Sequence, residues 1–331
     1  MDLLRNIGLL RSFLAVARAG NVTAAAERLG ISQPALTRNI HRLEEACGIQ
    51  LFDRHTRGVS LTVYGQTLLR YAQMIDTECR FATSELEALR HGHRGQLRIG
   101  GGPFWGATLL PRAIVRLHER FPQVRINLEI GVNKIVHPRL FSGDLDLVVS
   151  ASPRDIEALP DHISFTPITT IESRIFARQG HPIFDRPTVD NDDLSRFPWV
   201  LYQQDTDNIE RLTATMKALG VGPPRIAVES SALMSVVELV RTGDFLACLA
   251  APLFGTFHDI GIRPVPISRE IWSFDAGILY HRAIESSAPF EVLKQALVED
   301  VSRIGLISKI DASPADPLLQ AAGILTSRFD S

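Results

Sequence analysis

Apolar residues at the start of the chain recur at helical spacing. A first helix is predicted by the i, i+3, i+4, i+7 pattern of Leu10, Phe13, Leu14 and Ala17. Gly20 is placed to end this helix, and Asn21 or Thr23 can cap a second one, TAAAERL, which ends at Gly30. The small alanines of the second helix allow another helix to approach closely. The pattern therefore predicts a small helical unit at the start of the chain.

The stretch ISQPALTRNIHRLE, residues 31–44, predicts a third helix with two different faces. Ser32 is expected to cap it, and Pro34 lies in the first turn, where a missing N–H costs nothing. The apolar face consists of Leu36, Ile40 and Leu43. The polar residues Gln33, Thr37 and Arg38 point elsewhere. This is the pattern of a helix-turn-helix whose second helix enters a major groove, although an ordinary helix with a solvated face has the same pattern.

The next run, GIQLFDRHTRGVSLT, predicts two short strands around a turn at Arg57-Gly58. Such a wing would carry Arg54 and Arg57 toward a nucleic-acid backbone or a minor groove. The wing favours the DNA-binding interpretation of the helix pair.

A long helix is predicted from residue 63 to residue 89, because no proline interrupts this stretch and Thr62 can cap it. Its apolar residues are spaced alternately by four and three: Leu68, Ala72, Ile75, Cys79, Ala82, Leu86 and Leu89. This seam is typical of a two-stranded coiled coil, although a helix packed on its own domain also needs an apolar stripe. We favour a dimer, since two DNA-binding units related by a dyad can read paired half-sites. The charged stretch RHGHRG, residues 90–95, predicts a linker.

The rest of the chain alternates between predicted strands and helices. The first cycle comprises QLRIGG, the helix TLLPRAIVRLHERFP, VRINLEI, a helix at 134–142 and DLDLVVS. A second cycle begins near residue 165 with SRIFARQ, WVLYQQ, a helix around 207–219, RIAVES, ALMSVVELVRTG and FLACLAA. This alternation predicts parallel sheets in two α/β lobes, with a binding crevice beyond the carboxyl ends of the strands.

Composition and charge narrow the class of protein. The 331 residues are 45% hydrophobic, enough for two or more domains, and the net charge is −2, so the whole chain has no general attraction to nucleic acid. Residues 1–60, however, carry eight arginines against five acids, a net of +3 that leaves −5 for the remainder. Arginine suits phosphates and base edges, although an arginine-rich genome would give the same bias.

The cysteines and the N-terminal residues bear on the cellular compartment of the protein. Three distant cysteines with no Cys-x-x-Cys spacing indicate neither a disulfide framework nor a structural zinc, which fits a reducing cytoplasm. Arg11 and Arg18 interrupt the first apolar run, so we interpret it as an amphipathic helix and not as a signal peptide. No apolar run reaches transmembrane length, and no membrane partner is expected.

The run from Phe13 to Gly65 resembles the N-terminal domain of LysR-type transcriptional regulators, most specifically in QPALTRNIHRLEE and LFDR. The resemblance implies a winged helix-turn-helix that binds double-stranded promoter DNA. It implies that the DNA-binding residues are Thr23, Ser32, Gln33, Pro34, Ala35, Thr37, Arg38, Arg42, Arg54 and Arg57. Chemistry agrees, because Gln can bond bidentately to adenine, Arg to guanine, and Pro and Ala can meet thymine methyls.

The remainder resembles the effector-binding domain of the same family, a type 2 periplasmic-binding-protein fold, in the ordered motifs LRIG, LLP, GDLDLVV and LVRTGDFLACLAAPL. The implied domains are a winged helix-turn-helix at 1–62, a linker and dimerisation helix with its hinge at 63–94, an effector domain at 95–310 and an extension at 311–331. Lobe I would cover about 95–164 and 269–310, and lobe II about 165–268. The extension contains a possible helix at 317–325. The family further implies a homodimer that pairs into a homotetramer, and RNA polymerase as a partner.

The effector site is expected between the lobes. Where the family usually has a small hydroxyl residue suited to a carboxylate, this chain has Gly102, Pro103, Phe104 and Trp105, which argues against recognition of a simple carboxylate. The two aromatic residues offer flat faces, although they could equally belong to the lobe core. Neutral polar groups are expected across the cleft from Asn133, Tyr202, Gln203, Ser230 and Ser231. Such a set suits a sugar, a sugar-derived metabolite or an aromatic compound.

Three alternatives remain open. GGGPFWG, residues 100–106, mimics a dinucleotide-binding turn, but Pro103 removes a backbone donor and Glu129 has only roughly the spacing of the ribose-binding acid, so an NAD(P)-dependent dehydrogenase is a minor alternative. A transport binding protein would not need the DNA-binding unit. A regulator whose lobes bind no ligand is the third. We expect no catalysis, no metal and no cofactor, only an effector that changes the lobe angle and re-spaces the winged domains.

Overall fold

The structure, a computed structural model, describes residues 6–55, 58–91, 95–185, 189, 192–203, 205–253, 261–267 and 271–303. Contacts within the chain divide it into two compact units, Met1–Glu87 and Ala88–Ser331. The predicted extension, 311–331, and its possible helix at 317–325 lie outside the described residues.

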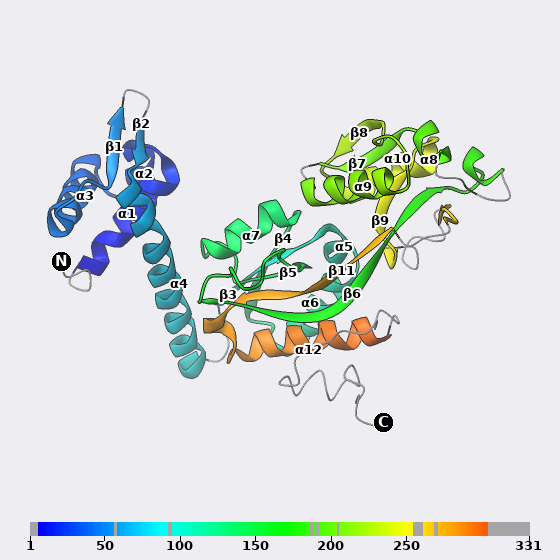
Figure 1. Ribbon diagram of the computed structural model, residues 1–331. Coiled ribbons are helices and arrows are strands. Elements are labelled where there is room, and N and C mark those ends of the chain that lie inside the picture. The colour runs from blue at the N-terminus through cyan, green and yellow to red at the C-terminus, as the bar shows by residue number, and fades with distance from the viewer. Residues whose placement is uncertain are drawn as a thin grey trace, which may run out of the picture. The chain divides into compact units, whose positions relative to one another are not determined.

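The first unit contains three short helices, a two-stranded wing and a long helix (Figure 1). In chain order these are α1 (Ile7–Ala19), α2 (Val22–Leu29), α3 (Gln33–Cys47), β1 (Phe52–His55), β2 (Gly58–Leu61) and α4 (Val63–His91). As predicted, α1 and α2 end at Gly20 and Gly30, whose φ angles of 62° and 67° are left-handed and turn the chain out of the helix. Of the two candidate caps of α2, Asn21 is the correct one, since its side chain accepts the N–H of Thr23 at 2.8 Å.

Helix α3 is fixed to α1 by one face. Ser32 caps it as predicted, because its Oγ accepts the N–H of Ala35 at 3.4 Å, and Pro34 lies in the first turn. The predicted apolar face is buried in the core of the unit through Leu36, Ile40 and Leu43. The amide of Asn39 donates to the hydroxyl of Ser12 in α1 at 3.0 Å. The opposite face of α3 is thereby held outward.

The wing is an antiparallel pair, in which Phe52 lies opposite Leu61 and His55 opposite Gly58. The two strands confirm the prediction. Gly58, placed in the turn by the sequence pattern, is the first residue of β2. Arg57, the other predicted turn residue, lies outside the described residues.

Helix α4 begins as predicted and then departs from the predicted seam. Thr62 caps it, since its Oγ accepts the N–H of Gly65 at 3.0 Å. Leu68 and Ala72 are buried in the core of the first unit, and Ile75 packs against that core half-buried. The prediction that Leu68 and Ala72 belong to a dimer seam is therefore wrong, because their own domain already covers them. Apolar spacing does not distinguish this packing from a coiled coil.

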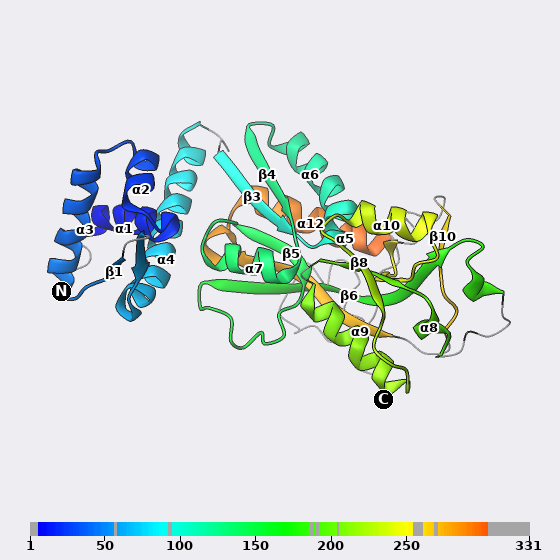
Figure 2. The same cartoon turned by 90° about the horizontal axis from the view of Figure 1, so that it is seen from above.

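The second unit has two lobes that share two long strands (Figures 1 and 2). Lobe I contains β3 (Gly95–Gly101), α5 (Pro103–Ala107), α6 (Leu109–Arg120), β4 (Val124–Ile130), α7 (Asn133–Phe141), β5 (Leu147–Ala151) and α12 (Ala288–Arg303). Lobe II contains α8 (Asp193–Arg196), β7 (Trp199–Tyr202), α9 (Thr206–Ala218), β8 (Ile226–Ser230), α10 (Leu233–Thr242), β9 (Ala247–Ala250) and β10 (Ile262–Pro264). The shared strands are β6 (Ile163–Arg178) and β11 (Trp272–His281). Each lobe has its own apolar core, around Leu140 in lobe I and around Trp199 in lobe II.

The main sheet runs in the order β10-β6-β11-β5-β3-β4, with β9 also paired to β6. The prediction of parallel sheets is correct for β4-β3-β5 and for β7-β8. It is wrong for β6 and β11, which pair antiparallel with each other and with β5, β9 and β10. In lobe I, α6 and α12 cover one face of this sheet and α7 the other (Figure 1).

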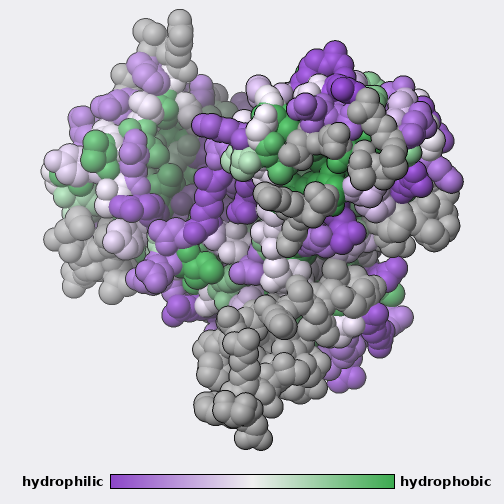
Figure 3. All heavy atoms as spheres, turned by 45° about the vertical axis from the view of Figure 1, so that its right-hand side comes forward, coloured by the Kyte–Doolittle hydropathy of each residue, from purple (hydrophilic) through white to green (hydrophobic). Residues whose placement is uncertain are grey.

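On the face drawn in Figure 3, the hydrophobic colour is restricted to separate small areas among hydrophilic side chains. Across the described ranges, no helix combines the length and the apolar character needed to cross a bilayer.

Candidate nucleic-acid interface and inter-lobe cavity

The outward face of α3 carries most of the predicted DNA-binding residues. Among the predicted residues of α3, four are exposed, namely Gln33, Pro34, Arg38 and Arg42. The other two, Ala35 and Thr37, are half-buried. Within the described part of the chain, the guanidinium groups of Arg38 and Arg42 have no hydrogen-bond or ion-pair partner. Thr23 and the cap residue Ser32 are also exposed. The face therefore presents two guanidinium groups and a primary amide to solvent.

Two further contacts orient this face, and sequence reasoning missed both. Asn39 ties α3 to α1 as described above. Glu44, near the end of α3, accepts the backbone N–H groups of Leu51 at 2.9 Å and of Phe52 at 3.3 Å through Oε1, so the wing is attached to the same helix. The feature of the sequence that could have indicated this contact is an acidic residue a few positions before the first wing strand. Of the predicted wing residues, Arg54 lies in β1. Its role, like that of Arg57, stays a prediction.

The later half of α4 keeps exposed residues at the predicted seam positions. Cys79 and Ala82 are exposed, and 63% of Leu86 is exposed. The side chain of Leu89 lies outside the described side chains. The dimerisation role of this part of the seam stays a prediction.

A cavity of about 150 Å³ lies between the lobes of the second unit. On the lobe I side it is bordered by the residues that follow β3 and β5, Gly102 and Ser152 among them, beyond the carboxyl ends of these parallel strands. On the lobe II side it is bordered by the beginnings of α9 and α10. This position agrees with the predicted crevice.

Six of the nine predicted effector residues line the cavity: Gly102, Pro103, Phe104, Trp105, Asn133 and Tyr202. The other three, Gln203, Ser230 and Ser231, are not among its lining residues, which corrects their predicted position. The backbone explains two of them. The N–H of Gln203 donates to the carbonyl of Ser230 at 2.8 Å, and the hydroxyl of Ser230 accepts the N–H of Ala232, so both are engaged at the strand ends.

The aromatic faces of the cavity differ from the predicted ones. Phe104 is 8% exposed and Trp105 is 2% exposed, so most of each ring belongs to the lobe core. Trp272 and Phe274, on the shared strand β11, are half-buried and line the cavity. Ser273, which lies between them in the sequence, is exposed. This alternation of apolar and polar residues along β11 is the feature of the sequence that could have predicted their position.

One side of the cavity is charged. Asp205 caps α9 by accepting the N–H of Asn208 at 3.3 Å, and Asp207 and Arg211 follow on the same helix. Burial raises the pKa of Asp205 to about 6, against the hydrogen bond from Asn208 and the charge of Arg211, which lower it. Burial also raises the pKa of Tyr202, and the nearby charge of Asp205 adds to this effect.

Beneath the cavity, a polar network fixes the lobe I wall. The Nε2 atom of His137 lies 2.8 Å from the hydroxyl of Ser150, and burial lowers the pKa of His137 to about 4, so its ring is neutral at pH 7. The amide of Asn133 donates to the carbonyl of Ala151 at 3.2 Å. Asn133 therefore has one of its donors engaged by the wall itself.

Packing explains the glycines that mimic a dinucleotide-binding turn. A Cβ added to Gly101 would lie 2.4 Å from Leu110, and one added to Gly106 would lie 2.2 Å from Ile130. Glu129, the candidate ribose-binding acid, forms an ion pair with Arg139. These residues thus serve the contact between β3, β4 and the following helices.

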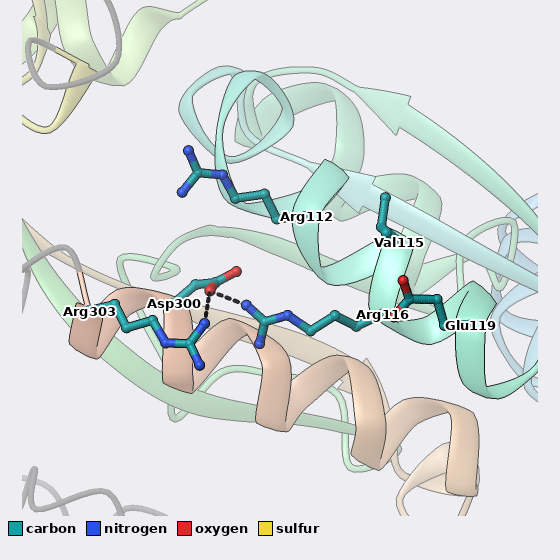
Figure 4. A pocket seen from close by; sticks show the side chains of 6 residues that line it. All are labelled: Arg112, Val115, Arg116, Glu119, Asp300 and Arg303. Atoms are coloured by element: carbon teal, nitrogen blue, oxygen red, sulfur yellow. Dashed lines mark hydrogen bonds and ion pairs between the residues drawn. The ribbon is translucent and has the colours of Figure 1, made fainter.

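A second hollow, of about 380 Å³, lies on the outer face of lobe I between α6 and α12 (Figure 4). Arg116 of α6 and Arg303 of α12 both point at Asp300, with which Arg116 forms a close ion pair. Arg112 points away from this group. The ion pairs of Arg116 with Asp300 and Glu299 join the two helices. Among the described residues, no group of three or more His, Cys, Asp or Glu side chains lies close enough to hold a metal.

Comparison with known proteins identifies the family that both units match. A family model described as "LysR substrate binding domain" matches residues 90–302, and one described as "Bacterial regulatory helix-turn-helix protein, lysR family" matches residues 7–66. An SDS degradation transcriptional activation protein of a Pseudomonas species is 35% identical over 74% of this chain and 78% of its own length.

Two solved structures share the fold. Full-length OxyR from Pseudomonas aeruginosa has a TM-score of 0.64 at 21% identity, with 90% of this chain and 94% of that chain covered. Full-length CbnR in complex with its target DNA has a TM-score of 0.56 at 22% identity, with 92% of this chain and 100% of that chain covered. The two-lobed unit and the winged helical unit thus occur together in solved proteins.

Proposed function

The chain belongs to the LysR family of DNA-binding transcriptional regulators, and from this premise we propose that a small molecule held between its lobes controls the spacing of its oligomer on promoter DNA. The observation that carries the proposal is the cavity bounded by both lobes. Because both lobes contribute to its wall, a ligand that fills it acts on their relative angle. A ligand shifts such an equilibrium only by binding the two arrangements with different affinity.

For DNA recognition, we propose that α3 lies in the major groove. Arg38 and Gln33 would contact base edges, Pro34 and Ala35 thymine methyl groups, and Thr37 a base or a phosphate. The wing arginines would contact the backbone or the minor groove, and Arg42 a phosphate. The exposure of the outward face of α3, including the side chain of Arg38, supports this assignment.

For assembly, we propose a homodimer formed through the later half of α4, with dimers pairing into a tetramer. The exposed side chains of Cys79, Ala82 and Leu86 support this choice. RNA polymerase would be a further partner, and the cytoplasm the place of action. The protein would act as a regulator and not as an enzyme, and would need no cofactor besides the effector.

For the effector, the sequence predicts a sugar, a sugar-derived metabolite or an aromatic compound. The open faces of Trp272 and Phe274 support a ligand with a flat or apolar part, and the polar groups of α9 support one with hydrogen-bonding groups. The relative named for SDS degradation adds alkyl compounds to the chemistry worth testing.

The test combines a ligand screen with a footprint. A thermal-shift screen of sugars, sugar acids, aromatic acids and alkyl compounds identifies a ligand, because binding to the folded state alone raises the melting temperature. That ligand should then change the length of the promoter footprint or the DNA bend. A ligand that binds without changing either would support a regulator whose DNA geometry is independent of ligand. Stabilisation by NAD would revive the dehydrogenase alternative.

A further inference from the structure

The lining of the inter-lobe cavity combines charged and apolar side chains that come from different elements. The charged residues lie on α9 and on the loop after β5: Arg154, Asp205, Asp207 and Arg211. The apolar residues lie mainly on the shared strands and on β9: Ile171, Cys248, Leu249, Ala250, Trp272 and Phe274. A ligand that matches both sets of side chains has one polar head and an apolar body. A sugar can stack one face on the indole of Trp272, but it has no extended apolar body to cover Ile171, Leu249 and Phe274 as well.

Arg154, one of these charged residues, connects the two lobes. It follows β5 in lobe I, and its Nη2 atom lies 2.7 Å from Oδ1 of Asp207 and 2.7 Å from Oε2 of Glu210, both on α9 of lobe II. One guanidinium group thus holds two carboxylates of the opposite lobe while it borders the cavity.

These partners can be exchanged at low cost. The side chain of Asp207 is 46% exposed and that of Glu210 is 64% exposed, so each carboxylate regains water when Arg154 releases it. Asp207 lies in the first turn of α9, where the helix dipole favours a negative charge without a partner. The guanidinium fork, in turn, matches any carboxylate or sulfate bidentately.

We infer that Arg154 anchors the effector's head group, and that the effector is an amphipathic anion whose carboxylate or sulfate displaces Asp207 and Glu210 from Arg154 while its apolar body lies against Trp272 and Phe274. The inference rests on the proposed function and specifies its ligand. Arg211, the second cation of the cavity, supports an anionic head. Exchange of partners at Arg154 removes a link between the lobes, so binding and lobe angle change together.

A series of compounds with one chain length tests the charge of the head. Full-length protein is titrated with octanoate, octyl sulfate, 1-octanol and octyltrimethylammonium below their micelle concentrations, and with an alkyl benzoate to distinguish an aromatic from an alkyl body. The anions should raise the melting temperature, and the alcohol and the ammonium compound should not. Stabilisation by octyltrimethylammonium alone would overturn the inference and assign the head to Asp205 and Asp207.

Two variants with opposite expected effects test Arg154. Arg154→Ala should weaken binding of the anions about tenfold or more, as expected for the loss of a charged hydrogen-bonding partner. The double variant Asp207→Asn, Glu210→Gln removes the competing carboxylates and should strengthen binding. A residue with a merely structural role would not give this opposition. Arg174→Ala is the matched control, since Arg174 is similarly exposed and pairs with Glu172 away from the cavity.

Failure of the inference is distinguishable from failure of the proposed function. Unchanged anion binding in Arg154→Ala would overturn the role of Arg154. A neutral sugar or a neutral aromatic compound that stabilises the protein and changes the footprint would overturn the anionic head, while the regulator with an inter-lobe effector would stand. If no compound changes the footprint although the anions bind as expected, the proposed coupling to DNA fails and the ligand class stands.

Discussion

Replacement of Glu44 by alanine isolates the contact that attaches the wing to α3. Oε1 of Glu44 accepts the N–H groups of Leu51 at 2.9 Å and of Phe52 at 3.3 Å. Leu51 is 1% exposed and Phe52 is also buried, so water has little access to replace the lost acceptor. The variant therefore leaves two backbone donors unsatisfied at the start of β1.

The expected magnitude follows from these two bonds. A hydrogen bond to a charged group is worth about 1.5–3 kcal/mol, and the longer bond contributes less than the shorter, so Glu44→Ala should cost about 2–4 kcal/mol. Glu44→Gln keeps one neutral acceptor and should cost about 1–2 kcal/mol. The free energy of unfolding of a small domain is about 5–15 kcal/mol, which exceeds the expected loss. Helices α1 to α3 should therefore stay folded while the wing opens more often.

Hydrogen exchange of the full-length protein measures this opening residue by residue. Exchange at the strands of the wing should increase most in Glu44→Ala, and DNA affinity should fall. A fall by a similar factor on all sequences would assign the wing to the backbone, which carries no base information, and a fall that differs between A·T-rich and G·C-rich sites would assign it to the minor groove. Glu45→Ala removes the same charge from an exposed neighbouring position of α3 and serves as the control. Equal exchange in Glu44→Ala and Glu45→Ala would refute the reasoning.

Three further predictions concern DNA binding, assembly and pH. Arg38→Ala should weaken promoter binding by about 1–3 kcal/mol, and Gln33→Ala should relax the choice of base at one position. Binding assays at fixed salt on wild-type and mutated DNA sites measure both effects. Unchanged promoter affinity in Arg38→Ala would exclude α3 as the recognition helix. Leu86→Asp places a charge on the exposed part of the α4 seam and should lower the oligomer mass in sedimentation without lowering the melting temperature of the lobes; an unchanged mass would exclude this seam. Burial raises the pKa of Asp205 to about 6, above its ordinary 3.8, so the folded state binds the proton of this carboxyl more tightly than the unfolded state does. The contribution of the protonated carboxyl to the free energy of unfolding is therefore complete below about pH 4 and is lost as the pH rises through 6. Asp205→Asn keeps the cap of α9 and should raise the unfolding free energy by about 2 kcal/mol at pH 7.5 and by much less at pH 4; an equal gain at both values would contradict a buried ionised carboxylate.

The parts of the fold that sequence predicted well are those fixed by neighbouring residues. Gly20 and Ser32 mark helix ends because backbone conformation and capping act within one turn. The apolar face of α3 follows from helical spacing alone. For the same reason the outward face of α3, with Arg38, could be identified from the order of its residues.

The parts that were missed depend on partners far away in the chain. The antiparallel pairing of β6 with β11 joins segments about a hundred residues apart, and no local pattern records it. The burial of Trp105 in the lobe core and the half-buried position of Trp272 on the cavity wall depend on how distant segments pack together. Arg154 gives no motif at all, since its importance comes from Asp207 and Glu210 of the other lobe. Leu68 and Ala72 show the same limit, because a stripe does not say what covers it.

The position of β11 between β5 and β6 has a consequence for synthesis of the chain. β6 ends at Arg178 and β11 begins at Trp272, so the ribosome makes the 93 residues between them before lobe I can receive its central strand. At about 5–20 residues per second this takes roughly 5–20 seconds. During that interval β5 is paired with β3 along one edge while its other edge is open, and β6 has no neighbour in lobe I. Newly made lobe I is therefore a candidate substrate for chaperones, and stalling of translation within lobe II should promote aggregation through the exposed edge of β5.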